Sequence, residues 1–219
     1  MKQPKLLAFL CALTWPLWLP SAQGDAVIEG TVTLPTRKAD APANPRYQVK
    51  NPAAVAAPDP PVAVVYLEGQ FPAAIRTNLP TQHLKQKGYQ FAPGLLPVQK
   101  GTTVEFPNFD DEYHSVFSYS KSKRFDLGRY RKDEKPATQT FEQPGVVKLY
   151  CEIHEHMRGL ILVLDTPHFT NTYPTGKYRL ERLPAGQYQL KAWIDEKTVW
   201  QKPVELKDGE TLRMDFDGK

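Results

Sequence analysis

Short apolar segments that are broken by turn residues constrain the fold of this chain more than any other feature. Residues 26–34 alternate between apolar and polar side chains, residues 62–67 are rich in valine, and residues 160–164 are apolar on both faces. These lengths and periods are typical of strands, and the last pattern is typical of a strand that is covered on both sides. Because the chain also has 21 prolines and no long pattern with a helical period, the sequence predicts an all-β fold.

The first 24 residues have the pattern of a secretory signal peptide. Lys2 and Lys5 precede an apolar run at residues 6–19, and small residues lead to a cleavage site after Gly24. The apolar run is too short to span a bilayer and contains Pro16. We therefore expect a mature protein that is exported to the periplasm and has no membrane span.

Charge and cysteine content narrow the function further. Removal of the leader takes two of the 28 basic residues, which leaves 26 against 24 acidic ones and lowers the formal charge from +4 to +2. This balance does not require nucleic acid or an anionic membrane as a partner. Cys11 leaves with the leader and Cys151 remains alone, so the mature chain is expected to have no disulfide. An idle exposed thiol is a liability in an oxidising compartment, so Cys151 is expected to be buried or bound to a metal.

Cys151, His154 and Met157 follow one another at intervals of three residues, between two apolar runs. A turn lets side chains at this spacing point the same way, which a flat strand does not allow. A thiolate, an imidazole and a thioether together suit copper, whereas structural zinc seldom uses methionine. A blue copper centre also needs a second histidine, and His114 is the candidate.

Three stretches of the chain resemble the cupredoxins, the blue copper proteins, and most closely those of the amicyanin and plastocyanin type. The likeness is carried by residues 98–108, 114–116 and 141–159, and it extends over about residues 82–165. It implies a cupredoxin Greek-key β-sandwich that binds one copper ion, which cycles between Cu(I) and Cu(II). It also implies a redox protein in the periplasm as the partner.

By this resemblance, the copper ligands are His114, Cys151 and His154, with Met157 as a weak axial ligand. His156 is an alternative to Met157 in the axial position. The other two histidines, His83 and His168, have no convergent partner in the sequence and are expected to be ordinary polar residues.

The chain departs from the common cupredoxin pattern beside two of the expected ligands. Ser115 follows the first histidine, where asparagine is common, and Ile153 precedes the second, where proline is common. Because groups around the ligands tune a metal site, these changes affect the expected reduction potential and leave the ligand set intact.

The C-terminal segment resembles the second half of a carboxypeptidase regulatory-like, transthyretin-type sandwich. Its residues 176–193 and 204–216 alternate around two turns, and residues 29–32 with 62–67 resemble the opening of the same fold. We therefore expect a second small β-sandwich domain, either interrupted by the cupredoxin or placed in series with it. The expected divisions are a signal peptide at 1–24, N-terminal strands and a proline- and alanine-rich loop at 25–70, a cupredoxin domain at 71–165, and the C-terminal sandwich strands at 166–219.

Residues 121–135 carry seven positive and three negative side chains. They are a docking face for an acidic partner or a solvated loop, and the sequence favours the loop because Phe125, Leu127 and Tyr130 interrupt the charges.

Three functions fit the sequence. The ligand set favours an electron carrier between periplasmic redox partners. The alternatives are a copper carrier or scavenger without a dedicated electron-transfer role, and a binding module with a degenerate site. We expect no enzyme activity, because a mononuclear blue copper site leaves no open position for a substrate.

Overall fold

The computed structural model describes residues 24–36, 55–71 and 79–218. Within these residues the regular elements are all strands, so the predicted all-β fold class is confirmed. The predicted signal peptide, apart from Gly24, and much of the proline- and alanine-rich loop lie outside the described residues. No helix with the length and hydropathy of a membrane span occurs in the described part of the chain.

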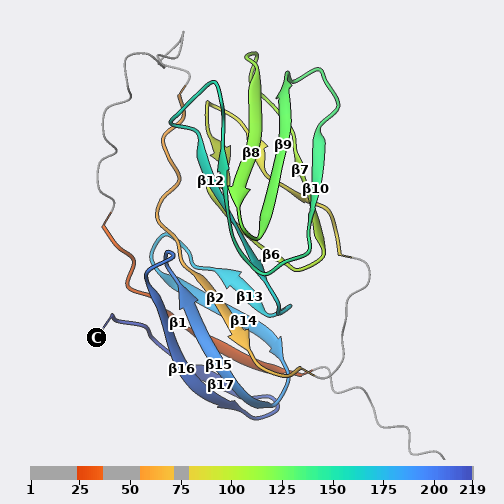
Figure 1. Ribbon diagram of the computed structural model, residues 1–219. Helices are drawn as coiled ribbons and strands as arrows, with labels where there is room; N and C mark the ends of the chain where they lie inside the picture. The colour runs from red at the N-terminus through yellow and green to blue at the C-terminus, as the bar shows by residue number, and fades with distance from the viewer. Residues whose placement is uncertain (1–23, 37–54, 72–78, 219) are drawn as a thin grey trace, which may run out of the picture.

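One group of strands forms two facing sheets, which we call the first sandwich (Figure 1). A five-stranded sheet has the order β6-β12-β11-β8-β9, a three-stranded sheet has the order β10-β7-β3, and β4 and β5 form a short pair beside them. The strands are β3 (Gln82–His83), β4 (Lys85–Gln86), β5 (Phe91–Ala92), β6 (Leu95–Gln99), β7 (Thr102–Phe106), β8 (His114–Ser120), β9 (Lys123–Tyr130), β10 (Ala137–Phe141), β11 (Gly145–Tyr150) and β12 (Arg158–Leu164).

Alternating side chains of these strands fill the core between the two sheets. Val104 and Phe106 of β7 face Val147 and Leu149 of β11, and all four are fully buried in one cluster. Cys151, the next residue of the same alternation, lies at the end of this apolar stripe and is 5% exposed. The alternation of these strands therefore places the sulfur at the rim of the core.

The remaining strands form the second sandwich, from sheets with the orders β14-β1-β17 and β13-β2-β15-β16. They are β1 (Ala26–Thr31), β2 (Val64–Glu68), β13 (Phe169–Asn171), β14 (Lys177–Leu183), β15 (Gly186–Trp193), β16 (Val199–Leu206) and β17 (Thr211–Arg213). Strand β1 pairs with β14 and, in parallel, with β17, while β2 lies between β13 and β15. Strands that precede the first sandwich in sequence thus pair with strands that follow it. The family likeness of this body and the domain limits remain predictions.

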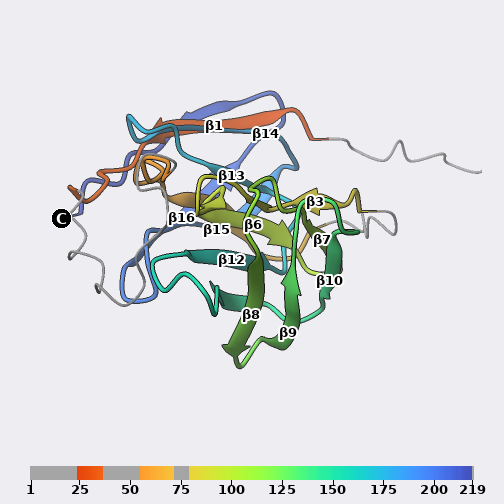
Figure 2. The ribbon, with the colours of Figure 1, turned by 90° about the horizontal axis from the view of Figure 1, so that it is seen from above.

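Strand β12 joins the two sandwiches. Ile161 and Val163 pack into the core of the first sandwich, whereas Leu162 and Leu164 pack against Val64 and Trp193 of the second. Figure 2 shows β12 lying beside β6, with which it pairs in parallel. The expectation that residues 160–164 are covered on both sides is confirmed.

The prediction that residues 121–135 form a solvated loop is wrong for most of that segment. Residues 123–130 form β9, which pairs antiparallel with β8. Phe125 and Leu127 pack against the core of the first sandwich, and Tyr130 is 6% exposed. Phe125 and Leu127 have the period of two that a half-buried edge strand requires, and Tyr130 follows after an irregularity in the pairing of β8 with β9.

Candidate metal centre

The turn between β11 and β12 points every third side chain inward. Cys151, His154 and Met157 are buried, whereas Glu152 and Glu155 between them are exposed. The backbone N–H of Met157 donates to the carbonyl of His154 at 2.9 Å, which closes the turn. The spacing of three residues therefore gathers three sulfur and nitrogen side chains on the core side of one loop.

His114 is the first residue of β8, the strand next to β11 in the sheet, and is fully buried. Its Nδ1 lies 3.0 Å from Nδ1 of His154, and the sulfur of Cys151 lies 3.8 Å from that Nδ1 of His154. Ligand atoms of these three residues all lie within 4.8 Å of one another. The structure thus brings together three of the four residues that the sequence nominated.

These separations suit a single metal ion. Nitrogen and sulfur ligands lie about 2.0–2.3 Å from a bound metal, so that two ligands of one ion are about 3–4 Å apart. The contacts of His154 with His114 and with Cys151 fall in this range. Two imidazoles and a thiolate are also the trigonal set of a blue copper site, so the residues fit copper in both geometry and chemistry.

Met157 is fully buried in the same core cluster as Cys151. His156, the alternative axial ligand, lies outside the convergent group, with its ring centroid 6.1 Å from that of His154. His83 pairs with Glu105 at 3.0 Å, away from the group. His156 therefore has no place in the convergent group, and Met157 as the axial ligand remains a prediction.

Asp110 fixes the orientation of the His114 ring. Its carboxylate accepts hydrogen bonds from Nε2 of His114 at 2.8 Å and from the backbone N–H groups of Gly88 and Tyr89 at 2.8 and 2.9 Å. Burial acts to raise the pKa of Asp110, but these hydrogen bonds outweigh it and hold the pKa below its ordinary value. Because an ionised carboxylate can only accept, Nε2 of His114 carries the proton and a neutral ring has its lone pair on Nδ1.

Tyr89 forms a wall over both histidines. Its ring meets the rings of His114 and His154 edge to face, with centroids 5.7 and 5.0 Å apart. Gly88 and Tyr89 both have positive φ angles, of 64° and 59°, a conformation that a tyrosine rarely adopts. The hydrogen bonds from these two residues to Asp110 hold the turn in place, as is common where strain serves a site.

Ser115 contacts the sulfur directly. Its backbone N–H donates to Sγ of Cys151 at 3.5 Å, and its hydroxyl lies 3.9 Å from the same atom. The hydroxyl also accepts a hydrogen bond from the backbone N–H of Glu152 at 2.8 Å. The residue that departs from the common cupredoxin pattern therefore ties β8 to the metal-site turn.

The pocket favours a thiolate even without a metal. Burial acts to raise the pKa of Cys151, but hydrogen bonds from His114, His154 and the Ser115 N–H outweigh it and lower the pKa to about 5. Burial acts to lower the pKa of His114, yet Cys151 and Asp110 raise it above its ordinary value. The metal-free pocket therefore favours the thiolate that a metal needs, and a metal ion that binds His114 competes with any proton on its Nδ1.

The sequence pointed to Ser115 as a residue beside the candidate site, but it did not predict Asp110 or Tyr89 as parts of it. The position of Asp110 four residues before a candidate ligand histidine is the signal that could have identified it. Gly88 indicates a turn, but the neighbouring sequence does not indicate that this turn contacts His114 and His154.

Comparison with known proteins gives partial structural matches. No model of a protein family matches the chain, and no curated protein sequence matches it significantly. A Cu-containing nitrite reductase from Thermus scotoductus is 25% identical with a TM-score of 0.38, over 44% of this chain and 26% of that one. The chain thus spans about a quarter of that enzyme's length. A purple cupredoxin from Nitrosopumilus maritimus is 24% identical with a TM-score of 0.34, over 38% and 99% of the two chains. An amicyanin mutant in its Cu(I) form is 18% identical with a TM-score of 0.36, over 46% and 98%.

Proposed function

We propose that this chain is an exported, mononuclear blue copper protein that carries one electron between redox proteins of the periplasm. The observation that supports this proposal most is the convergence of His114, Cys151 and His154, whose ligand atoms all lie within 4.8 Å. All three are at least nine-tenths buried, so an ion held by them is shielded from water on the core side.

In this proposal each residue has one role. Cys151 binds as the thiolate that its low pKa already favours, and His114 and His154 bind through Nδ1. Met157 is the weak axial ligand that helps to set the reduction potential. Copper supplies the Cu(I)/Cu(II) couple, and the protein supplies a ligand set that is held in place before the metal binds.

That rigidity supports electron transfer over metal exchange. Asp110 holds His114, Tyr89 covers both rings, and Ser115 holds the turn that carries Cys151. Supporting hydrogen bonds of this kind orient metal ligands and limit their movement. A site that rearranges little between two oxidation states exchanges an electron at low cost. We expect no enzyme activity, because the proposed ligands leave no open position for a substrate.

A copper carrier or scavenger is the second candidate function, and one observation favours it. His156 lies next to the site, and its buried Nε2 has no hydrogen-bond partner among the described residues. A free imidazole nitrogen beside a copper ion can receive the metal during exchange.

Copper loading of the exported full-length protein tests the proposal. We expect one copper per chain and an intense visible absorption band from sulfur-to-copper charge transfer. The substitutions Cys151→Ser and His114→Ala should abolish the band, whereas His83→Ala, a matched change at an exposed histidine, should leave it intact. Ascorbate should bleach the band and ferricyanide restore it over repeated cycles. A colourless Cu(I) complex that cannot be cycled would favour the carrier, and equal effects of the two histidine substitutions would contradict the assigned site.

A further inference from the structure

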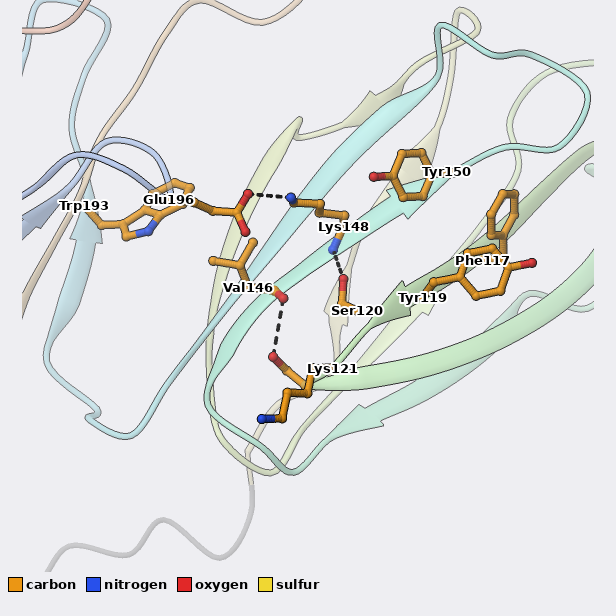
Figure 3. Close-up of a pocket in the computed structure, with 10 residues that line it drawn as sticks. Phe117, Tyr119, Ser120, Lys121, Val146, Lys148, Tyr150, Trp193 and Glu196 are labelled. Atoms are coloured by element: carbon orange, nitrogen blue, oxygen red, sulfur yellow. Dashed lines mark hydrogen bonds and ion pairs between the residues drawn. The ribbon is translucent and has the colours of Figure 1, made fainter.

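A groove of about 830 Å³ lies where the outer face of the five-stranded sheet meets the second sandwich (Figure 3). Strands β8 and β11 supply its floor through the side chains that point away from the core. Trp193, at the end of β15, and Glu196, in the following loop, supply its other wall. The groove therefore exists only because the two sandwiches pack against each other.

Aromatic rings line the floor of this groove. Phe117 stacks on Tyr150 with ring centroids 5.7 Å apart, and Tyr119 follows with its centroid 5.3 Å from that of Phe117. Tyr119 is 66% exposed, which is the second-largest exposed fraction among the large hydrophobic residues that the structure describes. Accessible aromatic side chains in a concave site are typical of the centre of a protein interface.

The charges around these rings are mainly positive. Lys121 lines the groove, and the guanidinium of Arg124 lies over the ring of Tyr119 at 4.9 Å. Neither forms an ion pair with a carboxylate within the described ranges. Lys148 pairs with Glu196 across the groove, so that this pair adds no net charge. Asp126 is the acidic residue next to Phe117 across the β8–β9 ladder, and it offsets one of the two free cations.

The groove is also close to the metal centre through the chain itself. Tyr150 is covalently adjacent to Cys151, and its ring lies on the groove side of the sheet. The two histidines, by contrast, are 0% and 8% exposed and lie behind Tyr89. Tyr150, the chain neighbour of Cys151, thus reaches the surface at the groove, while the rings of His114 and His154 are covered.

We propose that an acidic redox protein docks in this groove and exchanges its electron with the copper site through Cys151 and Tyr150. The proposal rests on the proposed function. In the forward step Cu(I) is oxidised to Cu(II) as the partner gains the one electron that copper loses. The aromatic floor supplies apolar contact, and Lys121 and Arg124 supply the charge complementarity that attracts an acidic surface.

Stopped-flow oxidation of the Cu(I) protein by hexacyanoferrate(III), a trivalent anion, tests the groove. The variant K121E/R124E reverses both free cations, and K177E/K207E makes the same change in charge at exposed residues of the second sandwich. At low ionic strength we expect the groove variant to react at least about tenfold more slowly than wild type. The control variant should stay within about twofold. All variants should keep the charge-transfer band and thermal midpoint of wild type.

A titration of the Cu(I) protein with hexacyanocobaltate(III), an anion of the same shape that transfers no electron, locates the contact. Amide shifts should concentrate in residues 117–122 and 146–150. Equal slowing in both variants, or shifts confined to residues 87–94 and 152–156, would overturn the groove proposal and leave the proposed electron-carrier function intact. Wild-type protein that forms no charge-transfer band would instead refute the proposed function itself.

Discussion

Removal of the Asp110 carboxylate should weaken copper binding without removing a ligand. The side chain is 13% exposed and accepts three hydrogen bonds, from Nε2 of His114 and from the backbone N–H groups of Gly88 and Tyr89. In Asp110→Ala the ring of His114 loses the partner that sets its tautomer, and the turn that carries Tyr89 loses its anchor. The site keeps its donors but loses their fixed orientation.

The expected size of this effect follows from the three contacts. Hydrogen bonds to a charged group contribute about 1.5–3 kcal/mol each, and neighbouring contacts do not add fully. Breaking one partner of a buried charged network costs about 3–5 kcal/mol, which we expect as the loss in the free energy of unfolding of the metal-free protein. Loss of a supporting hydrogen bond to a ligand lowers metal affinity about 10–100-fold.

Asp110→Asn separates the two parts of this prediction. An amide oxygen at the position of Oδ2 still accepts from His114 and Tyr89, while its NH₂ group faces the N–H of Gly88. One mismatched donor should cost about 1–3 kcal/mol and leave copper affinity closer to wild type.

Urea unfolding of the metal-free protein and competition with a copper chelator measure the two effects. Asp111→Ala is the matched control, because Asp111 is exposed and pairs with Lys132 at the surface. It should leave stability nearly unchanged, because exposed ion pairs contribute little. The reasoning is refuted if Asp110→Ala binds copper within about twofold of Asp111→Ala.

Three further changes test other parts of the site. Ser115→Ala should lower the reduction potential, because the Cys151 thiolate loses a hydrogen-bond donor. It should also destabilise the protein by about 1–3 kcal/mol, because the Glu152 N–H loses its acceptor. Voltammetry measures the potential and urea unfolding the stability, and an unchanged potential would contradict the prediction. The folded-state pKa of Cys151, about 5, is below its ordinary value, so its contribution to the stability of the metal-free protein is complete above the ordinary thiol pKa and is lost as the pH falls through about 5. Urea unfolding at pH values between about 5 and 9 spans the folded-state and ordinary pKa of the thiol. The stability difference between wild type and Cys151→Ser should shrink toward low pH over this range, and a constant difference would count against a thiolate. Met157→Leu should keep the charge-transfer band but change the reduction potential, and loss of the band would show that Met157 does more than bind weakly along the axis.

The sequence predicted the parts of this structure that depend on local pattern. The alternation in residues 102–106 and 145–150 determines which side chains enter the core, and the two apolar faces of residues 160–164 predict a cover on each side. The interval of three residues in the metal-site turn likewise predicts which side chains converge, because it reflects the geometry of one short loop.

The groups that support the site could not be predicted in this way, because their partners are distant in sequence. Asp110 acts through backbone N–H groups more than 20 residues earlier, and the place of Tyr89 depends on a left-handed turn that its own side chain disfavours. Ser115 meets Cys151 only because β8 and β11 are neighbours. The charge of residues 121–135 obscured the edge strand β9, since the number of charges outweighed the short alternation around Phe125 and Leu127.

X-ray absorption at the copper edge, recorded on the Cu(I) and Cu(II) forms of the full-length protein, tests the central claim most directly. We predict one short copper–sulfur distance and two imidazole nitrogens in both forms, with little change between them. A shell of oxygen and nitrogen alone, or a coordination number that changes with oxidation state, would contradict a copper site built from Cys151, His114 and His154.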